Sequence, residues 1–387
     1  SDEHLHKTNE SPSYSSKWSN GLNSTSPRLK EAMESPLKLP ALLTLETLRI
    51  ESLSLSSIFT TASRPPPTPS FELVSGLGKG GYAIVVLVRV RQANEDQGRF
   101  AMKVISKGMI ATGASSKKQQ EKLRTELSIM RDIAPSSRFL ENCHTAFESS
   151  TNVFFVCDYI AGGDLFYHMS RRMDQGHFGF ELDECRILLA ELFMGVQHLH
   201  AHDFIHRDLK VENIMLDASG HVKLIDFGIA CCIPNDGLEQ SMSVSGSLIY
   251  MAPKLIRFRK GGRHTDWWSF GVVAFELMTG RSPWSSLTDR QIIRDEIVSC
   301  LVSPPDWVPA SAEQLLKGLL SRNWRTRLGT RKDQELSDSR FLEGTDLSAM
   351  ERGMTPPAFV CGPADILPDV SGNAVKSYKS MAAAAEG

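Results

Sequence analysis

The order of apolar and polar positions divides the chain into a β-rich part and a helical part that follows it. Short runs rich in β-branched and aromatic residues come first and predict strands at 71–74, 84–90, 100–105 and 153–159. One charged stretch among them, 115–133, favours a helix. Beyond residue 163, longer runs with helical periodicity predict helices at 182–200, 267–279, 289–302 and 312–320. Strands first and helices later indicate an α+β protein with two lobes of different character.

Both ends of the chain differ from this central part. The first seventy residues are dense in Ser and Thr and close on the run RPPPTP, which favours an extended polyproline conformation. Within them, 37–59 is rich in Leu and Ile and fits either a docking helix or apolar residues in a disordered tail. Helical periodicity fades from residue 344. We expect a leader at 1–70, a β-rich lobe at 71–156, a helical lobe at 157–343 and a tail at 344–387.

Composition and charge exclude several classes of protein. The 387 residues carry 43 Lys and Arg against 45 Asp and Glu, a net charge of −2, which gives no reason to expect a nucleic-acid surface. No apolar run approaches the roughly 18 residues that span a bilayer. The 7 cysteines are odd in number and show no paired spacing, so we expect reduced thiols in a cytoplasmic or nuclear protein without a signal peptide.

A glycine-rich run, GKGGY at 78–82, lies in the turn between two predicted strands. Glycines let backbone N–H groups approach phosphate oxygens because no Cβ stands in the way. A tight hairpin without a ligand explains the run equally well. It is not a Walker A loop, because no Gly-Lys-Ser/Thr follows, and it opens no helix as a dinucleotide-binding loop would.

Lys103 lies inside an apolar predicted strand. A buried ammonium is costly unless an anion pairs with it, and Glu126 on the following helical stretch could supply that charge. The alternative is a lysine that reaches solvent from an edge strand.

The strongest signal is the run HRDLKVEN at 206–213, followed by DFG from Asp226. Asp208 could accept a proton from a hydroxyl group, and Lys210 could neutralise a transferring phosphoryl group. Asn213 and Asp226 offer the oxygen ligands that Mg²⁺ prefers. Both motifs, in this order after a glycine-rich loop and a strand lysine, indicate phosphoryl-transfer chemistry.

Over about residues 71–341 the chain resembles the eukaryotic protein kinases. Later blocks agree with the family's order: SGS at 245–247, YMAP at 250–253, DWW at 266–268 and RLG at 327–329. The loop, the double Trp and the RLG block resemble the AGC group most. The resemblance implies a bilobal protein-kinase-like fold, with a small antiparallel β-rich lobe and a larger, mainly α-helical lobe. It also implies transfer of the γ-phosphoryl group from ATP, with Mg²⁺, to Ser or Thr.

The resemblance implies roles for individual residues. The implied catalytic residues are Lys103, Glu126, Asp208, Lys210 and Asn213, and the implied metal ligands are Asn213 and Asp226. Lys103 would hold the α- and β-phosphates and pair with Glu126, while Asp208 would be the catalytic base. The implied nucleotide contacts are Leu77, Gly78, Lys79, Gly80, Gly81, Tyr82, Val85, Ala101, Lys103, Asp158 and Ile160. Cys157 aligns with the gatekeeper behind the adenine pocket.

Three acidic residues, Asp164, Glu212 and Glu276, match the family positions that accept Arg side chains upstream of the target hydroxyl. A carboxylate and a guanidinium form charge-assisted bonds, so a basic preference is physically reasonable. The alternative is three solvated acids without a ligand.

Ser243 aligns with the phosphorylated activation-loop residue of AGC kinases. A phosphate on Ser243 could pair with Arg207 and Lys122 and order the loop. The alternative is an exposed serine that is never modified.

The chain departs from the family pattern at several positions. Ala83 replaces the third loop glycine, and Cys231 stands where a basic residue often helps to bind the loop phosphate. Lys254 replaces a Glu that pairs, in the family, with the Arg matching Arg327, which would set two cations together. Another acid must then approach, the segment must move, or the lobe is less stable. Phe359 is the last Phe, so no Phe-rich hydrophobic motif follows it.

Two alternatives to an active kinase remain at this stage. A pseudokinase scaffold or regulatory binding module is motivated by Ala83 and Lys254. A small-molecule phosphotransferase of similar fold is disfavoured by the blocks at 245–253 and 266–268, which serve peptide binding in the family. As partners we expect protein substrates with basic residues near Ser or Thr and an upstream activating kinase, with no nucleic acid, no membrane span and a monomeric state.

Overall fold

The computed structural model describes residues 70–79, 83–92, 95–109, 114–149, 151–233, 240–299 and 301–361. Residues 1–69 of the predicted leader, including 37–59, lie outside these ranges, and so do residues 80–82 of the glycine-rich loop and the end of the predicted tail. None of the helices in the described ranges combines the length and the apolar character needed to cross a membrane. All cysteines within those ranges have free thiols.

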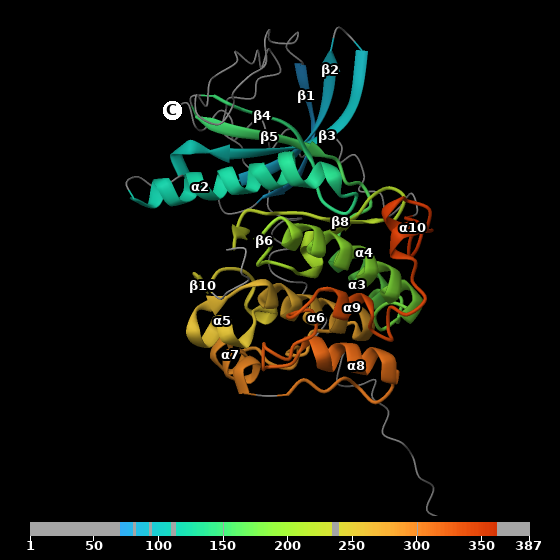
Figure 1. Cartoon of the computed structure of the whole chain (residues 1–387). Helices are drawn as coiled ribbons and strands as arrows, with labels where there is room; N and C mark the ends of the chain where they lie inside the picture. The colour runs from blue at the N-terminus through green and yellow to red at the C-terminus, as the bar shows by residue number, and fades with distance from the viewer. Residues whose placement is uncertain are drawn as a thin grey trace, which may run out of the picture.

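The upper lobe is built on a five-stranded antiparallel sheet in the order β1-β2-β3-β5-β4 (Figure 1). Its strands are β1 (Ser70–Lys79), β2 (Ala83–Gln92), β3 (Glu95–Ser106), β4 (Cys143–Glu148) and β5 (Asn152–Asp158). Side chains alternate between the two faces, so Val86 and Val88 pack on the outer face with Met102. Phe155 and Cys157 face inward and join the main core.

Helix α2 (Ala114–Ser128) lies beneath the sheet, on the side of the helical lobe (Figure 1). It continues without a break into a π-helical turn, η3 (Ile129–Ile133), and a 3₁₀ turn, η4 (Ala134–Ser136). The sequence predicted one helix to residue 133. The change of winding precedes Pro135, which lacks a backbone N–H and restricts the residue before it.

The lower lobe is mainly helical. Its helices are α3 (Leu165–Asp174), α4 (Leu182–Ala201), α5 (Pro253–Phe258), α6 (Arg263–Thr279), α7 (Arg290–Ser299), α8 (Ala310–Leu319), α9 (Gln334–Ser337) and α10 (Leu347–Glu351). Helix α4 begins with a capping box between Glu181 and Glu184. Helix α6 is buried on nearly all sides, with Trp267 and Trp268 fully enclosed, and ends at Gly280 in the left-handed conformation.

Short paired strands and 3₁₀ turns connect these helices and position the loops. The pairs are β6 (Phe204–Ile205) with β9 (Cys231–Cys232), β7 (Ile214–Leu216) with β8 (Val222–Leu224), and β10 (Gln240–Ser241) with β11 (Lys260–Gly261). The 3₁₀ turns are η2 (Lys107–Met109), η5 (Val211–Asn213) and η6 (Leu248–Tyr250). The predicted α+β fold with two unlike lobes is confirmed.

Two regions differ from the sequence predictions. Strand β4 and helix α3 were not predicted: a bulge at His144 interrupts the alternation of β4, and α3 spans only 10 residues. The segment after residue 344, where helical periodicity fades, forms the short helix α10 and then packs on the helical lobe as far as Cys361. Phe359 stacks on Phe180 with ring centroids 5.7 Å apart, and Cys361 is buried.

Candidate active site

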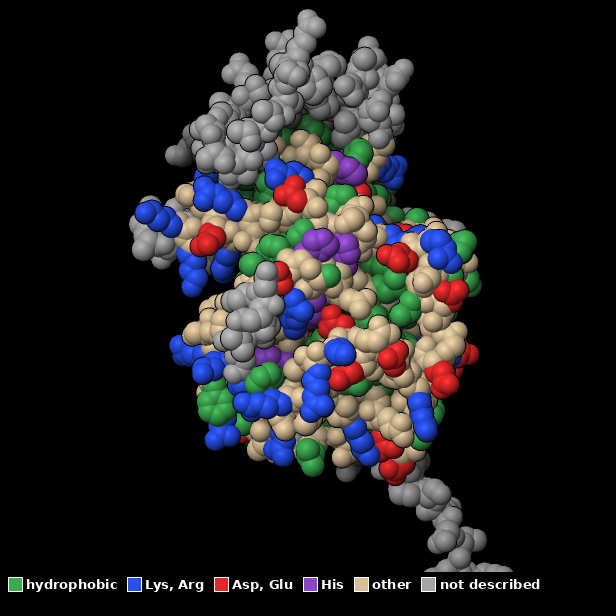
Figure 2. All heavy atoms as spheres, in the orientation of Figure 1, with side chains coloured by type: hydrophobic (Ala, Val, Ile, Leu, Met, Phe, Trp, Pro, Cys, Tyr) green, Lys and Arg blue, Asp and Glu red, His purple; other side chains and the backbone are tan. Residues whose placement is uncertain are grey.

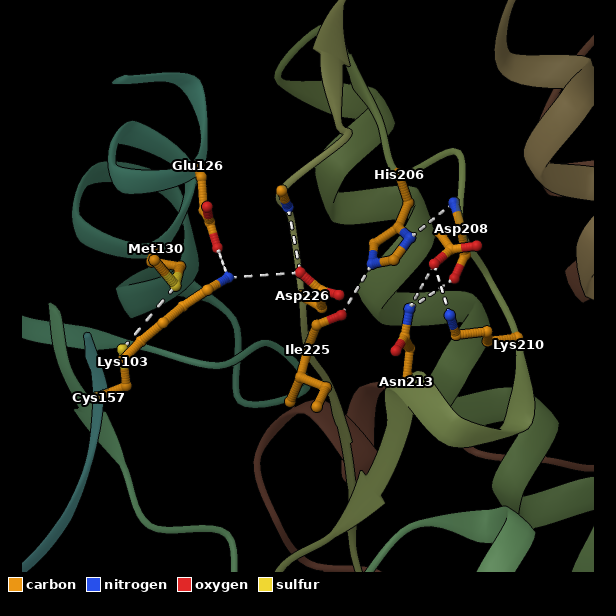
Figure 3. Close-up of polar contacts among 11 residues, drawn as sticks. Lys103, Glu126, Met130, Cys157, His206, Asp208, Lys210, Asn213, Ile225 and Asp226 are labelled. Carbon is orange, nitrogen blue, oxygen red and sulfur yellow. Dashed lines mark hydrogen bonds and ion pairs between the residues drawn. The ribbon is translucent and has the colours of Figure 1, made fainter. Parts of the chain in front are cut away.

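Lys103 of β3 lies at the centre of a group of charges between the two lobes (Figure 3). Its Nζ contacts Oε1 of Glu126 on α2 and lies 3.5 Å from Oδ1 of Asp226. Burial alone would lower the pKa of Lys103, but the two carboxylates outweigh it and hold the pKa above its ordinary value. The ammonium is therefore charged and paired inside the protein rather than extended into solvent.

Asp208 lies across the site from Lys103 and is held by three donors. Lys210 Nζ lies 2.7 Å from its Oδ2, and Asn213 Nδ2 donates to the same oxygen at 3.2 Å and to the Asp208 carbonyl at 2.9 Å (Figure 3). The backbone N–H of Ser247 donates to Oδ1 at 3.0 Å. These contacts fix the direction of the carboxylate, as is needed in a group that orients a hydroxyl.

Asp266 of α6 holds the loop that carries Asp208. Its fully buried carboxylate accepts hydrogen bonds from the backbone N–H groups of His206 and Arg207, at 2.8 and 2.9 Å, and contacts His200 Nε2 at 2.9 Å. Arg207 has a φ of 72°, a left-handed conformation that costs free energy for a residue with a side chain. The bonds to Asp266 offset this cost and so position Asp208.

Asp226 also adopts a left-handed conformation, with a φ of 64°. The next residue, Phe227, is fully buried and makes an edge contact with the His206 ring, whose Nε2 lies 3.0 Å from the carbonyl oxygen of Ile225. Burial opposes ionisation of Asp226, yet Lys103 and other cations lower its pKa. The packing of Phe227 thus directs an ionised Asp226 toward Lys103.

Asn213 lies directly before β7 and Asp226 follows β8, which pairs with β7, so the two residues could hold a metal ion together. The backbone N–H of Ile225 donates to the Asn213 carbonyl at 3.0 Å, which sets the two segments side by side. In the described part of the chain, no group of three or more His, Cys, Asp and Glu side chains is arranged for a metal. Mg²⁺ usually binds through one or two protein oxygens together with substrate phosphates, so this donor set fits Mg²⁺.

The described residues implied for nucleotide binding belong to strands β1, β2 and β3 and to the connection between the lobes. Val85 pairs with Lys103 across β2 and β3, and Ala101 pairs with Cys157 across β3 and β5. Strands β1 and β2 pair as far as Lys79, with an irregularity at Leu77.

The connection between the lobes is anchored by the side chain of Asp158. Its Oδ1 lies 2.7 Å from His144 Nε2, and its Oδ2 accepts from the side chain of Asn142 at 3.2 Å. These contacts lower the pKa of Asp158 against the effect of burial. Since Ile160 is 5% exposed, this segment can offer mainly backbone groups to a ligand.

Sequence reasoning missed Glu141, an acid that interacts with the same group of charges. Burial raises the pKa of Glu141 to about 7, although Lys103 and the backbone N–H of Asp226 favour its ionised form. Repulsion from the carboxylate of Glu126 also raises the pKa of Glu141. The available signal was a single acid inside the apolar run FLENC. The carboxyl groups of Glu126, Asp226 and Glu141 thus all interact with the ammonium group of Lys103.

The three acids implied in substrate binding are brought together around Glu212. Glu276 is buried, accepts a 2.6 Å hydrogen bond from the Tyr250 hydroxyl, and has its pKa raised to about 8 by burial and by Glu212. Asp164 caps α3 by accepting from the backbone N–H of Tyr167 at 2.7 Å. Burial, with a contribution from Glu212, raises its pKa to about 6. Only Glu212 is exposed.

Ser243 is exposed beside a group of cations. Arg207 Nη2 donates to its carbonyl at 2.7 Å and to its hydroxyl at 3.2 Å, and the Ser245 hydroxyl lies 3.1 Å away. Lys122 of α2 is close enough to Arg207 that burial and this cation together lower its pKa. The thiol of Cys231 also interacts with Arg207. Arg207 and Lys122 thus form a positive site next to the serine hydroxyl.

Arg327 does not have, among the described residues, the compensating acid that the sequence suggested as one possibility. Arg327 is 1% exposed, and its guanidinium donates to the carbonyls of His264, at 2.6 Å, and Ser321, at 3.0 and 2.8 Å. No carboxylate of the described residues forms an ion pair with Arg327. The Nζ of Lys254 lies 4.1 Å from the ring centroid of Trp324. Backbone carbonyls and an aromatic ring therefore take the place of the carboxylate.

Comparison with known proteins agrees with this geometry. Residues 71–339 match the model of the protein kinase domain. The chain is 35% identical over 297 residues to ribosomal protein S6 kinase alpha-4 of Homo sapiens, across 75% of this chain and 37% of that protein. It is 33% identical over 308 residues to ribosomal protein S6 kinase beta of Caenorhabditis elegans, across 78% of this chain and 53% of that protein.

A probable serine/threonine-protein kinase of Dictyostelium discoideum is 34% identical over 285 residues, across 73% of this chain and 59% of that protein. The alignments with these three relatives thus cover from 37% to 59% of each relative's length. The similarity includes the segments that carry the charges described above.

Proposed function

Because the chain belongs to the protein kinase domain family and is similar to AGC-type serine/threonine kinases, we propose that it transfers the γ-phosphoryl group of MgATP to Ser or Thr in proteins. The observation that carries the proposal is the position of Asp208, held by Lys210, Asn213 and Ser247. It faces the group formed by Lys103, Glu126 and Asp226 (Figure 3).

In this proposal the residues around Lys103 bind and orient the nucleotide. Lys103 holds the α- and β-phosphates, and Glu126 keeps the ammonium in place. Asn213 and Asp226 would hold Mg²⁺, which supplies positive charge to the phosphates when it is bound. The inner face of the sheet and the backbone near Asp158 would contact the adenine.

Asp208 accepts or directs the proton of the attacking hydroxyl group, and Lys210 stabilises the charge on the transferring group. The protein forms no covalent bond in this step, so the rate depends on position and charge. The hydrogen bond from Ser247 to Asp208 links the substrate-binding segment to the catalytic loop. Correct placement of that segment therefore contributes directly to the orientation of Asp208.

We assign the preference for Arg upstream of the target to Glu212, Asp164 and Glu276. The interaction of Glu212 with the other two acids supports this assignment, since a guanidinium bound among them would favour the ionised form of acids whose pKa is raised. We also propose that an upstream kinase phosphorylates Ser243 and that the protein acts as a monomer in the cytoplasm or nucleus.

The test is a transfer assay with Mg²⁺, labelled ATP and a degenerate Ser/Thr peptide library. Asp208→Asn should lower the rate by about 10²–10⁴-fold, whereas Asp306→Asn, the same change at an exposed residue, should leave it unchanged. Peptides with Arg upstream should be preferred. ATP binding without transfer, even after phosphorylation of Ser243, would contradict the proposal and favour a scaffold.

A further inference from the structure

Positive charge is concentrated on two segments of the helical lobe that lie away from the active-site residues in sequence. Residues 252–265 contain five Lys and Arg residues and no Asp or Glu. Residues 321–327 contain three more cations and again no acid. Because the whole chain carries a net charge of −2, these cations are segregated rather than part of a generally basic protein.

The two segments are joined in the fold through Trp324. The Nζ of Lys254 lies 4.1 Å and the Cζ of Arg325 lies 4.8 Å from its ring centroid, and the His264 ring packs 4.7 Å away. The hydrogen bond from Arg327 to the carbonyl of His264 also links the two segments. The result is one continuous surface, which we call the basic patch: Lys254, Arg257, Arg259, Lys260 and Arg325.

Four of the five cations of the basic patch are exposed and form no ion pair within the described residues. Arg257, Arg259, Lys260 and Arg325 are exposed, and none of the four forms an ion pair with a carboxylate in the described part of the chain. In Figure 2, Lys and Arg side chains gather on the lower left, where Figure 1 places α5. Burial and three neighbouring cations lower the pKa of Lys254, which is consistent with a positive local potential.

The patch is fixed to the activation segment by the backbone. Strand β11, which contains Lys260, pairs with β10 at Ser241. The N–H of Met242 donates to the carbonyl of Arg259 at 2.8 Å, one residue before Ser243. A partner bound to the patch would therefore lie beside the segment that carries the candidate phosphorylation site.

We propose that the basic patch binds an acidic protein segment, at a place separate from the acids of the substrate site. Several like charges on a fixed surface attract a complementary chain and raise its association rate. Phe258 is 57% exposed next to Arg257 and offers an apolar contact to a peptide side chain. Because Lys254 and Arg325 both lie over the Trp324 ring, stacking of a nucleic-acid base is disfavoured, so a peptide fits better than RNA.

The test measures binding of a labelled twelve-residue peptide of Asp and Glu to the full chain at physiological salt by fluorescence anisotropy. The triple variant Arg257→Glu, Arg259→Glu and Lys260→Glu should weaken binding at least tenfold. The matched control reverses three exposed cations elsewhere, Lys332→Glu, Arg340→Glu and Arg352→Glu, and should change binding less than twofold. Binding to the wild type should weaken as salt is added.

Three results would overturn the proposal: no binding of the acidic peptide, equal affinity in the triple variant, or tighter binding of RNA or anionic phospholipid vesicles of matched charge. If the Glu variant fails to fold, the variant with Gln at the same three positions replaces it, because the backbone bond of Arg259 does not depend on its side chain. Asp208→Asn should bind the peptide as tightly as the wild type does. The binding test therefore does not depend on whether the protein transfers phosphate, and the two proposals can fail separately.

Discussion

Arg327 donates a 2.6 Å hydrogen bond from Nη1 to the backbone carbonyl of His264, and no carboxylate of the described residues accompanies it. Burial lowers the pKa of Arg327 to about 9, so the guanidinium remains charged at neutral pH. A buried charge with only neutral acceptors is less stable than one paired with a carboxylate in good geometry. The helical lobe therefore carries a local weakness beside Lys254.

The first prediction concerns this weakness. Lys254→Glu should raise the melting temperature by a few degrees, because a carboxylate near Arg327 gains about 1–3 kcal/mol and outweighs the lost contact with Trp324. Differential scanning calorimetry measures the change. Lys254→Gln is the control, since it removes the repulsion without forming a pair. A melting temperature that does not rise in the Glu variant would show that the carbonyls already compensate the charge.

The second prediction concerns pH and Glu276. The folded protein raises the pKa of Glu276 to about 8, whereas the unfolded chain has a value near 4.5. The folded state therefore binds more protons between these values, and stability falls by up to about 1.4 kcal/mol per unit as pH rises through this window.

Glu276→Gln keeps an acceptor for the Tyr250 hydroxyl and removes this titration. The difference in melting temperature, Gln variant minus wild type, should thus increase from pH 5 to pH 8 and stay constant above pH 8. Glu343→Gln, the same change at an exposed acid, is the control. A difference in melting temperature between the Gln variant and the wild type that stays constant over the whole pH range would contradict the raised pKa of Glu276.

The third prediction concerns Glu141 and nucleotide binding. Its carboxyl group interacts with Lys103, whose ammonium is already shared by Glu126 and Asp226. Negative charge there opposes the phosphates of ATP, so Glu141→Gln should lower the Kd for MgATP several-fold at pH 8. The effect should shrink at pH 6, because burial raises the pKa of Glu141 to about 7 and the acid is then mostly neutral. Isothermal titration calorimetry at both pH values is the measurement, and weaker binding by the variant would refute the idea.

The fourth prediction concerns Ser243. Treatment with an activating kinase should raise peptide phosphorylation by at least tenfold in the wild type, because a phosphate would pair with Arg207 and Lys122 and order the segment. Ser243→Ala should lose this increase, whereas Ser241→Ala, two residues earlier, should keep it. Full activity of the Ser243→Ala protein before and after treatment would contradict activation by phosphorylation of Ser243.

Much of the fold was predictable because local patterns and tertiary packing agree. The period-2 runs became β2, β3 and β5, and the helical run at 182–200 became α4, since one face of each had to be buried. Strand β4 escaped prediction because a bulge at His144 interrupts its alternation, and helix α3 spans only 10 residues. Their positions depend on contacts with distant segments.

The sequence by itself determined the order and identity of the chemical groups, because Lys103, Glu126, Asp208, Asn213 and Asp226 belong to motifs with fixed spacing. Only the tertiary structure decided which charges meet. Residues far apart in sequence share one environment after folding, and burial then sets the energy of each charge. For this reason the interactions of Glu141 with Lys103, of Arg327 with backbone carbonyls, and of the two cationic segments around Trp324 became visible only in the folded chain.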